Sequence, residues 1–204
     1  VVCCLPTGGG KTTTAGYIVY RAAKIKKRVG ICVHRDNLVT QFSDRLKSQF
    51  NIIPGRIQSG YRRSKRLVQV MSLMSLDPNN LPPLDILFID EGHRSKGENY
   101  ERLIKSYPDA KVCALTATPF RNDGKGLGDL FDRIVQPIKM AEVIKEGYLV
   151  DTRVFDPDSS MLADIKSLPG DEESFDKGSM FQSYDKPKVY DGVVANYLKN
   201  AKGT

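Results

Sequence analysis

The sequence predicts an α/β protein in which helices cover both faces of a mainly parallel sheet. Short apolar runs recur along the chain with helically patterned segments between them, which is typical of βαβ units. A glycine-rich loop follows the first apolar run, and an acidic pair ends a later one. Because open α/β sheets bind ligands at the carboxyl ends of their strands, both patterns are expected at one edge.

The first apolar run, residues 1–5, is short and β-prone, and a helical pattern follows from Thr12. The loop between them is predicted to bind a polyphosphate, because glycines let consecutive N–H groups point inward and the helix N-terminus adds positive charge. Lys11 is placed to reach the β and γ phosphates, and the Thr12 hydroxyl to coordinate Mg²⁺. Leu5 stands where the general P-loop consensus has glycine. The candidate nucleotide-binding residues are Pro6, Thr7, Gly8, Gly9, Gly10, Lys11, Thr12 and Thr13.

A second apolar run, residues 84–89, leads into Asp90 and Glu91. Asp90 is expected to hold the metal, directly or through water, and Glu91 to act as general base on the attacking water. Taken alone, two adjacent carboxylates could also cap a helix N-terminus. Together with the phosphate loop they favour nucleotide hydrolysis.

The remaining elements follow from the same patterns. A strand is predicted over 29–33, and the helix after it carries Leu38, Val39, Phe42 and Leu46 at helical spacing. A short strand and turn over 56–60, a strand over 67–71, a helix around Leu103 and a strand over 111–115 come next. Further predictions are a strand over 134–138, a helix over 140–146 closed by Gly147, and a last strand over 150–155.

The expected organisation is one α/β domain over 1–155, a polar linker or irregular segment over 156–188, and an amphipathic helix in 189–204. A chain of 204 residues with 40% hydrophobic content can bury one such core. No apolar run approaches the roughly 20 residues of a membrane span, and no signal peptide opens the chain. The protein is therefore expected to be cytoplasmic, without a membrane partner.

The 31 Lys and Arg residues exceed the 24 Asp and Glu residues, and the formal charge of +7 favours a polyanionic partner. Two basic clusters stand out, residues 24–28 and residues 62–66, and either could simply be a solvated face. The four cysteines fall in apolar runs without metal-ligand spacing, so they are predicted to be small core residues.

Four motifs occur in order: PTGGGKT, VHRDNLVTQF, DEGH and LTATPF. This series resembles the first RecA-like domain of a superfamily 2 helicase or translocase. The later stretches RNDGKG and EGYLV look most like the bacterial RadD and type III restriction-subunit branch. The resemblance covers about residues 1 to 155 and implies ATP and Mg²⁺ as ligands and nucleic acid as the track, DNA rather than RNA.

The resemblance also implies roles for individual residues. Asp90-Glu91-Gly92-His93 corresponds to the DEAH or DECH box, with Gly92 at its variable third place, and His93 would join the catalytic set of Lys11, Asp90 and Glu91. Coupling to movement would involve Thr116, Thr118 and Arg121. The residues expected to contact nucleic acid are His34, Arg35, Gln41, Ser59, Gly60, Arg62, Arg63 and Ser72.

In such motors ATP is hydrolysed between two RecA-like domains, and nothing after Phe155 resembles the second domain. The chain is thus expected to be the ATP-binding lobe of a longer motor, bacterial or phage-encoded, and monomeric as a fragment. A P-loop kinase or small-molecule ATPase would explain the loop and the acidic pair but not LTATP. The motifs would also suit an RNA helicase fragment, and the basic charge would suit an inactive fragment that only binds nucleic acid.

Overall fold

The computed structural model describes residues 1–92, 98–119, 127–151, 170–171, 174–175 and 194–199. The chain divides into two compact units, residues 1–151 and 152–204, and each is treated by itself. The predicted domain boundary at residue 155 lies outside the described residues.

The first unit contains a seven-stranded sheet in which every pair of neighbouring strands is parallel, as predicted. The strands lie in the order β3-β4-β2-β5-β6-β1-β7. Their bounds are Val2–Cys4 for β1, Val29–Val33 for β2, Gly55–Ile57 for β3, Val68–Ser72 for β4, Ile86–Asp90 for β5, Lys111–Thr116 for β6 and Ile134–Val135 for β7.

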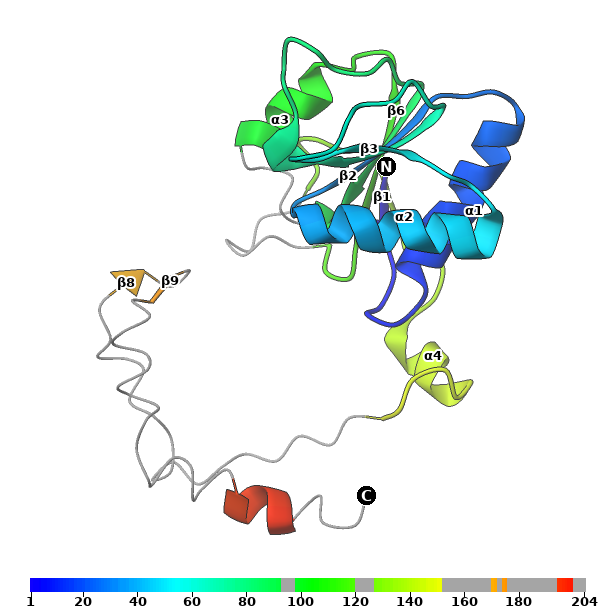
Figure 1. Cartoon of the computed structure of the whole chain (residues 1–204). Helices are drawn as coiled ribbons and strands as arrows, with labels where there is room; N and C mark the ends of the chain where they lie inside the picture. The colour runs from blue at the N-terminus through cyan, green and yellow to red at the C-terminus, as the bar shows by residue number, and fades with distance from the viewer. Residues whose placement is uncertain (93–97, 120–126, 152–169, 172–173, 176–193, 200–204) are drawn as a thin grey trace. The chain divides into compact units, whose positions relative to one another are not determined.

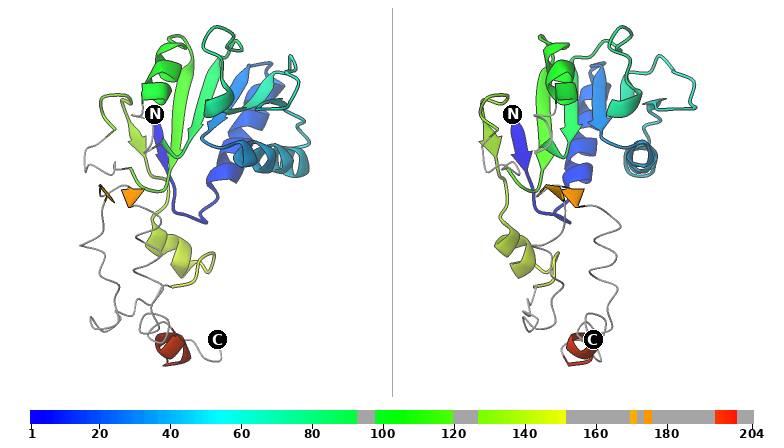
Figure 2. Two further views of the ribbon diagram at one scale, coloured as in Figure 1. Left: turned by 60° about the vertical axis from the view of Figure 1, so that its left-hand side comes forward. Right: turned by 90° about the vertical axis from the view of Figure 1, so that its left-hand side faces the viewer.

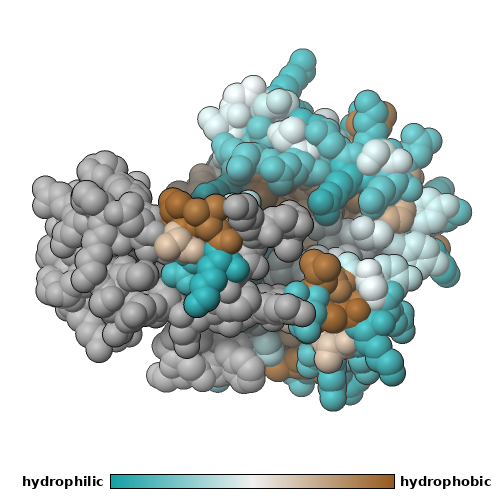
Figure 3. All heavy atoms as spheres, turned by 90° about the horizontal axis from the view of Figure 1, so that it is seen from below, coloured by the Kyte–Doolittle hydropathy of each residue, from teal (hydrophilic) through white to brown (hydrophobic). Residues whose placement is uncertain are grey.

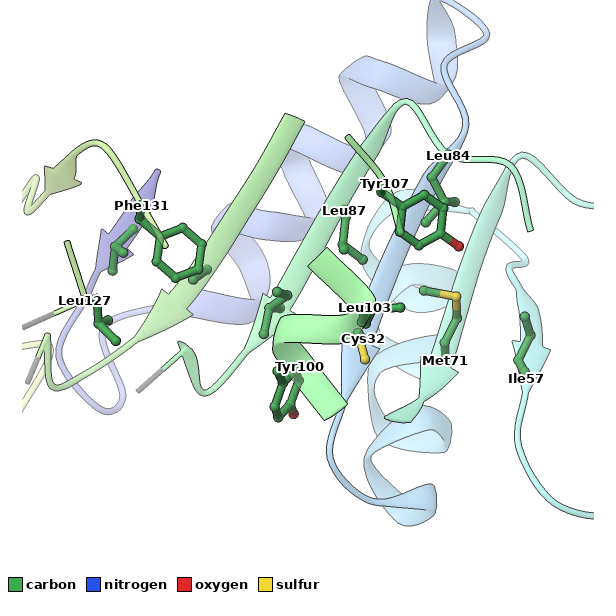
Figure 4. Packing of buried hydrophobic residues seen from close by; sticks show 13 residues of the cluster. Cys32, Ile57, Met71, Leu84, Leu87, Tyr100, Leu103, Tyr107, Leu127 and Phe131 are labelled. Atoms are coloured by element: carbon green, nitrogen blue, oxygen red, sulfur yellow. The ribbon is translucent and has the colours of Figure 1, made fainter. Parts of the chain in front are cut away.

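Helices cover both faces of this sheet (Figures 1 and 2). On one face α1 (Lys11–Lys24) and α2 (Asp36–Phe50) contribute Val19 and Phe42 to a core that includes Ile31 of β2. On the other face α3 (Glu98–Lys105) contributes Leu103 to a second core. Figure 4 shows this second core, where α3 packs over Cys32, Leu87 and Met71. The central strands are therefore buried on both sides, as their near-continuous apolar sequences predict.

Two short helices complete the first unit, the 3₁₀-helix η1 (Leu73–Ser75) and α4 (Met140–Lys145). The prediction for β7 was too long, because that strand ends at Val135. Pro137 has no N–H to donate to a ladder, and β7 is an edge strand with exposed side chains. Val150 and Asp151 are not in a strand, and the rest of the predicted strand over 150–155 lies outside the described residues.

In the second unit, β8 (Gly170–Asp171) pairs with β9 (Ser174–Phe175) in an antiparallel arrangement, where the sequence predicted only an irregular segment. Residues 194–199 form a helix within the predicted helical segment. None of the helices that the structure describes has the length and apolar character needed to cross a bilayer.

Candidate active site

The phosphate loop connects β1 to α1, in the strand, loop, helix context that the sequence predicted. Gly8 and Gly10 adopt left-handed backbone conformations, with φ of 78° and 84°, and Gly10 is the N-cap of α1. The Gly9 N–H donates to the Pro6 carbonyl oxygen at 2.9 Å, which closes the turn. No acidic residue lies in the first turn of α1, so its positive N-terminal end is left for an anionic ligand.

Lys11 and Thr12 begin α1 and are half-buried. Burial raises the pKa of the Cys4 thiol, and the nearby Lys11 charge opposes that increase, which locates the ammonium group beside the end of β1. The Thr12 side chain has no hydrogen bond within the described part of the chain, so its hydroxyl is available to a metal. The Thr13 hydroxyl instead donates to Gln49 Oε1 at 3.4 Å and faces α2. Leu5 is 3% exposed, so this departure from the consensus is a core residue.

The carboxyl ends of β1, β6 and β5 lie side by side. Cys4 pairs with Thr116 across β1 and β6, and Asp90 pairs with Leu115 across β5 and β6. Two strand spacings separate the end of β1 from Asp90, or about 10 Å. Lys11 and Thr12 therefore follow a strand that is two places from the one carrying Asp90.

Glu91 adopts a left-handed conformation, with φ of 55°. The other described non-glycine residues with positive φ are Lys26 and Asn51, which lie just past the ends of α1 and α2, where this conformation is common. Glu91 instead follows a strand directly. A strained backbone at such a place is typical of functional sites.

Gly92 lies directly against β6. A Cβ atom added at Gly92 would lie 2.6 Å from the Ala114 Cβ, closer than real Cβ atoms approach. The turn that carries Asp90 and Glu91 is thus packed tightly on the neighbouring strand. His93 and Arg121, the remaining catalytic and coupling candidates of the sequence, lie outside the described residues.

The Thr116 hydroxyl closes the turn after β6. It donates to the Thr118 carbonyl oxygen at 2.7 Å and accepts from the Thr118 N–H at 3.1 Å. Thr116 is fully buried and Thr118 is exposed. The two threonines therefore fix the turn after β6, on the strand between those that lead to the phosphate loop and Asp90.

The nucleic-acid candidates follow the other strands of the sheet. His34 and Arg35 lie between β2 and α2, and the exposed Gln41 lies within α2. Ser59 and Gly60 are exposed after β3. The Ser59 N–H donates to Ser75 Oγ at 3.1 Å, and that hydroxyl donates to Asp36 Oδ1 at 3.3 Å, which ties this turn to the start of α2.

Two of these candidates are less available than the sequence suggested. Ser72 has no exposed surface, so in this conformation its hydroxyl is closed to a nucleic-acid backbone. Arg63 donates to the Asn80 carbonyl oxygen at 2.5 Å. Arg62 is exposed and has no partner within the described residues.

Sequence reasoning missed the contact of Leu149 with the phosphate loop. A Cβ atom at Gly8 would lie 2.7 Å from Leu149 Cδ2, so this leucine packs directly on the loop although it lies far away in the chain. No periodicity or charge pattern marks Leu149. Its neighbours in the motif EGYLV were the only signal.

ATP and Mg²⁺ fit the residues present. The left-handed glycines and the helix start without acids suit a polyphosphate, and a threonine hydroxyl with one carboxylate suits Mg²⁺, which takes its remaining ligands from phosphates and water. Within the described residues no group of three His, Cys, Asp or Glu side chains forms a metal cage. Figure 3 shows the protein from below the view of Figure 1, the side on which the phosphate loop lies. The described surface on this side is mostly hydrophilic, with separate apolar patches.

A cavity of about 750 Å³ lies elsewhere, at the amino-terminal edge of the sheet. It is lined by Arg28 and Asp85, whose side chains form a salt bridge with Arg28 Nη2 and Asp85 Oδ1 2.9 Å apart. Hydrogen bonds from Arg28 hold the pKa of the Asp85 carboxyl well below its usual range. This cavity is remote from the strand ends that carry the phosphate loop and Asp90, so it has no part in the candidate site.

The model of the family "Type III restriction enzyme, res subunit" matches residues 1–121. The chain is 24% identical over 198 residues to a 51.5 kDa protein of Lactococcus phage (isolate 7-9), covering 97% of this chain and 41% of that protein. It is 32% identical over 147 residues to the DNA 3'-5' translocase XPB2 of Sulfurisphaera tokodaii, covering 70% of this chain and 32% of the translocase.

Among solved structures, the UvsW helicase of bacteriophage T4 matches with a TM-score of 0.59 at 16% identity, covering 67% of this chain and 54% of that one. That likeness shows the same fold. The family match favours a helicase lobe over a P-loop kinase or small-molecule ATPase. The chain spans less than half of the two relatives' lengths. It belongs to the type III restriction enzyme res-subunit family, and it corresponds to the first RecA-like domain of superfamily 2 proteins.

Proposed function

We propose that this chain is the ATP-binding and hydrolysing lobe of a DNA helicase or translocase. One observation carries the proposal: the phosphate loop, the Thr116 turn and the Asp90-Glu91 pair leave three adjacent parallel strands at one edge. This arrangement supports the proposal that a polyphosphate site, a metal-binding carboxylate and a general base share this edge of the sheet.

The role of each residue follows from its chemistry. The loop N–H groups and Lys11 would bind the phosphates, and Thr12 and Asp90 would hold Mg²⁺, which would supply positive charge to neutralise the phosphates. Glu91 orients the attacking water and accepts its proton. His93, Thr116, Thr118 and Arg121 are proposed to connect this site to movement on nucleic acid.

Nucleic acid is proposed to lie along the carboxyl ends of β2 and β3, near Arg35, Gln41, Ser59 and Gly60, which are exposed there. His34 begins the same turn as Arg35. Contacts to phosphates suit a motor that steps along any sequence, because they carry no base information. DNA is favoured over RNA because one relative is named as a DNA translocase and the matching family is named for a restriction enzyme.

A second RecA-like domain in the same longer protein is proposed to complete the site, since the chain covers only 32% to 41% of the two relatives. A cytoplasmic protein of a bacterium or phage, acting in DNA repair or restriction, fits the phage relative and the restriction-enzyme family.

The test is ATP turnover by the full-length protein with single-stranded, duplex and branched DNA and with RNA, compared side by side. Lys11→Ala should abolish stimulated turnover, while Lys24→Ala, at the other end of α1, should leave it unchanged. Glu91→Gln should keep nucleotide binding and stop hydrolysis. Stimulated turnover that survives Lys11→Ala would rule out the phosphate-loop assignment, and stimulation by RNA alone would rule out DNA as the track.

A further inference from the structure

The positive charge of the chain is concentrated in one segment. Residues 45–76 contain no Asp or Glu and carry seven cations: Arg45, Lys47, Arg56, Arg62, Arg63, Lys65 and Arg66. The net charge of the whole chain is +7, so the remaining residues are formally balanced. This segment runs from the second half of α2 through β3 and β4, which together form one end of the sheet.

Within this segment, the loop from Gly60 to Leu67 connects β3 to β4, and we call it the basic loop. A buried side chain fixes its shape from beneath. Gln69 of β4 is 4% exposed, and its Nε2 donates to the carbonyl oxygens of Ser64 at 2.7 Å and Arg66 at 2.9 Å. A Cβ atom on Gly55 of β3 would collide with Gln69 Oε1, so only glycine leaves room for the amide there.

The arginines of the basic loop divide into two kinds. The side chains of Arg63 and Arg66 bind the protein itself, since they donate hydrogen bonds to the carbonyl oxygens of Asn80 and Ile53. Arg62 and Lys65 are exposed and have no hydrogen bond or ion pair within the described residues. Two guanidinium groups thus fasten the loop, while two other cations are held outward for a ligand.

The basic loop also carries an aromatic ring, Tyr61, which directly precedes Arg62. Tyr61 is 51% exposed, and the Arg56 guanidinium lies 5.7 Å from the centroid of its ring. Arg56 is itself held by Asp44 at 3.1 Å. A supported, half-exposed ring next to free cations is the combination that binds single-stranded nucleic acid, through base stacking and phosphate contacts.

We propose that the basic loop is a second contact surface for single-stranded nucleic acid, in which Tyr61 stacks on a base, Arg62 and Lys65 contact phosphates, and Gln69 is the positioning residue. This rests on the proposed function, because it adds to the track at the carboxyl ends of β2 and β3. It also changes the roles expected from the sequence, since Lys65 replaces Arg63 as a phosphate contact.

The test measures binding of the chain to a fluorescein-labelled oligo-dT 20-mer by anisotropy, without nucleotide, between about 50 and 200 mM NaCl. Arg62→Ala combined with Lys65→Ala should make the negative slope of log affinity against log salt shallower by about 1.4, because each single-strand phosphate contact contributes about −0.7. Tyr61→Phe should bind as the parent does, while Tyr61→Ala should weaken binding about tenfold.

The matched control is Lys111→Ala combined with Lys145→Ala, which removes the same charge at exposed positions on β6 and on α4, the helix that follows the strand at the opposite end of the sheet. It should leave the slope unchanged. Equal slopes for the two double variants would overturn the proposal. So would a duplex of the same length that binds equally well and shows no effect of Tyr61→Ala, because the surface would then follow phosphates without stacking.

Gln69→Leu tests the positioning role, since it removes two hydrogen bonds and no charge. It should weaken oligo-dT binding and make the negative salt slope shallower, while leaving affinity for a fluorescent ADP analogue unchanged. Unchanged oligo-dT binding by a folded Gln69→Leu chain would remove Gln69 from the proposal. If this variant does not fold, the Tyr61 variants and the double variant of Arg62 and Lys65 still test whether the basic loop binds single-stranded nucleic acid. Because no step requires ATP, failure here is distinguishable from failure of the ATPase assignment.

Discussion

At the scale of single residues, the tight contact between Gly92 and Ala114 gives a specific prediction. Gly92→Ala should lower the free energy of unfolding by about 1–3 kcal/mol, the usual cost of overpacking, because neither methyl group can move aside. Urea unfolding followed by circular dichroism measures this change.

A double variant isolates that contact. Ala114→Gly removes the opposing methyl and should itself destabilise the strand by about 0.5–1 kcal/mol. In the combination with Gly92→Ala the two changes should offset each other, so that the pair is less destabilised than the sum of the single variants. Strict additivity would show that β5 and β6 relax freely at this point. The variable third place of the box would then be unconstrained by packing.

The positions of the candidate site residues were predictable from sequence where a motif coincides with a strand end. Lys11, Thr12 and Asp90 follow apolar strands, and strand ends are where parallel sheets place their ligands. Ser72 shows the limit, because it also ends a strand yet is fully buried. Whether a side chain at a strand end is buried depends on which residues from other elements cover it, and these residues cannot be identified from the local sequence.

At the scale of elements, the turn after α4 supports the phosphate loop through Leu149. The N–H groups of Tyr148 and Leu149 donate to the Val143 carbonyl oxygen, and Val143 is buried, so the turn is anchored to α4. Leu149 then packs against Gly8, where the loop has no side chain of its own. A leucine in this position limits the conformations of the empty loop and so reduces the entropy lost on phosphate binding.

Leu149→Ala should therefore weaken binding of a fluorescent ADP analogue about fivefold, equivalent to about 1 kcal/mol of added backbone freedom. Fluorescence titration of the chain measures the dissociation constant. Val150→Ala is the control, since Val150 is 91% exposed and its loss should not change affinity. Equal affinities for both variants would mean that the loop is fixed by its own hydrogen bonds, such as that of Gly9 to Pro6.

The elements themselves were largely predictable, because the central strands β2, β4 and β5 are apolar throughout most of their length and the helices between them have clear periodicity. The errors lie at the edges. β7 has one neighbouring strand and is cut short near a proline, and the pair of β8 and β9 has only two residues in each strand. Such short elements depend on pairing partners and packing more than on local pattern, so their bounds cannot be predicted from the local sequence.

At the scale of the whole molecule, all described residues of the candidate site come from one edge of a single sheet. The phosphate loop, Asp90 and Glu91 all belong to one sheet edge, and the described residues of the first unit include no arginine placed by any contact over the phosphate loop. Phosphoryl transfer in P-loop enzymes gains several orders of magnitude from an arginine supplied by a facing element. We therefore expect nucleotide binding and efficient hydrolysis to separate when this chain is studied alone.

The 204-residue chain should bind ADP weakly, turn over ATP slowly, and fail to separate strands. The full-length protein should show turnover that rises with nucleic acid. A forked duplex labelled with a fluorophore and a quencher reports strand separation for both proteins under the same conditions, and Glu91→Gln in the longer protein is the inactive control. The expected difference arises because opening a duplex costs about 1.4 kcal/mol for each base-pair step, which one lobe binding the strand at a single edge cannot supply repeatedly. ATP-dependent strand separation by the 204 residues alone would contradict a two-lobed motor and would place the whole mechanical cycle within this sheet and its loops.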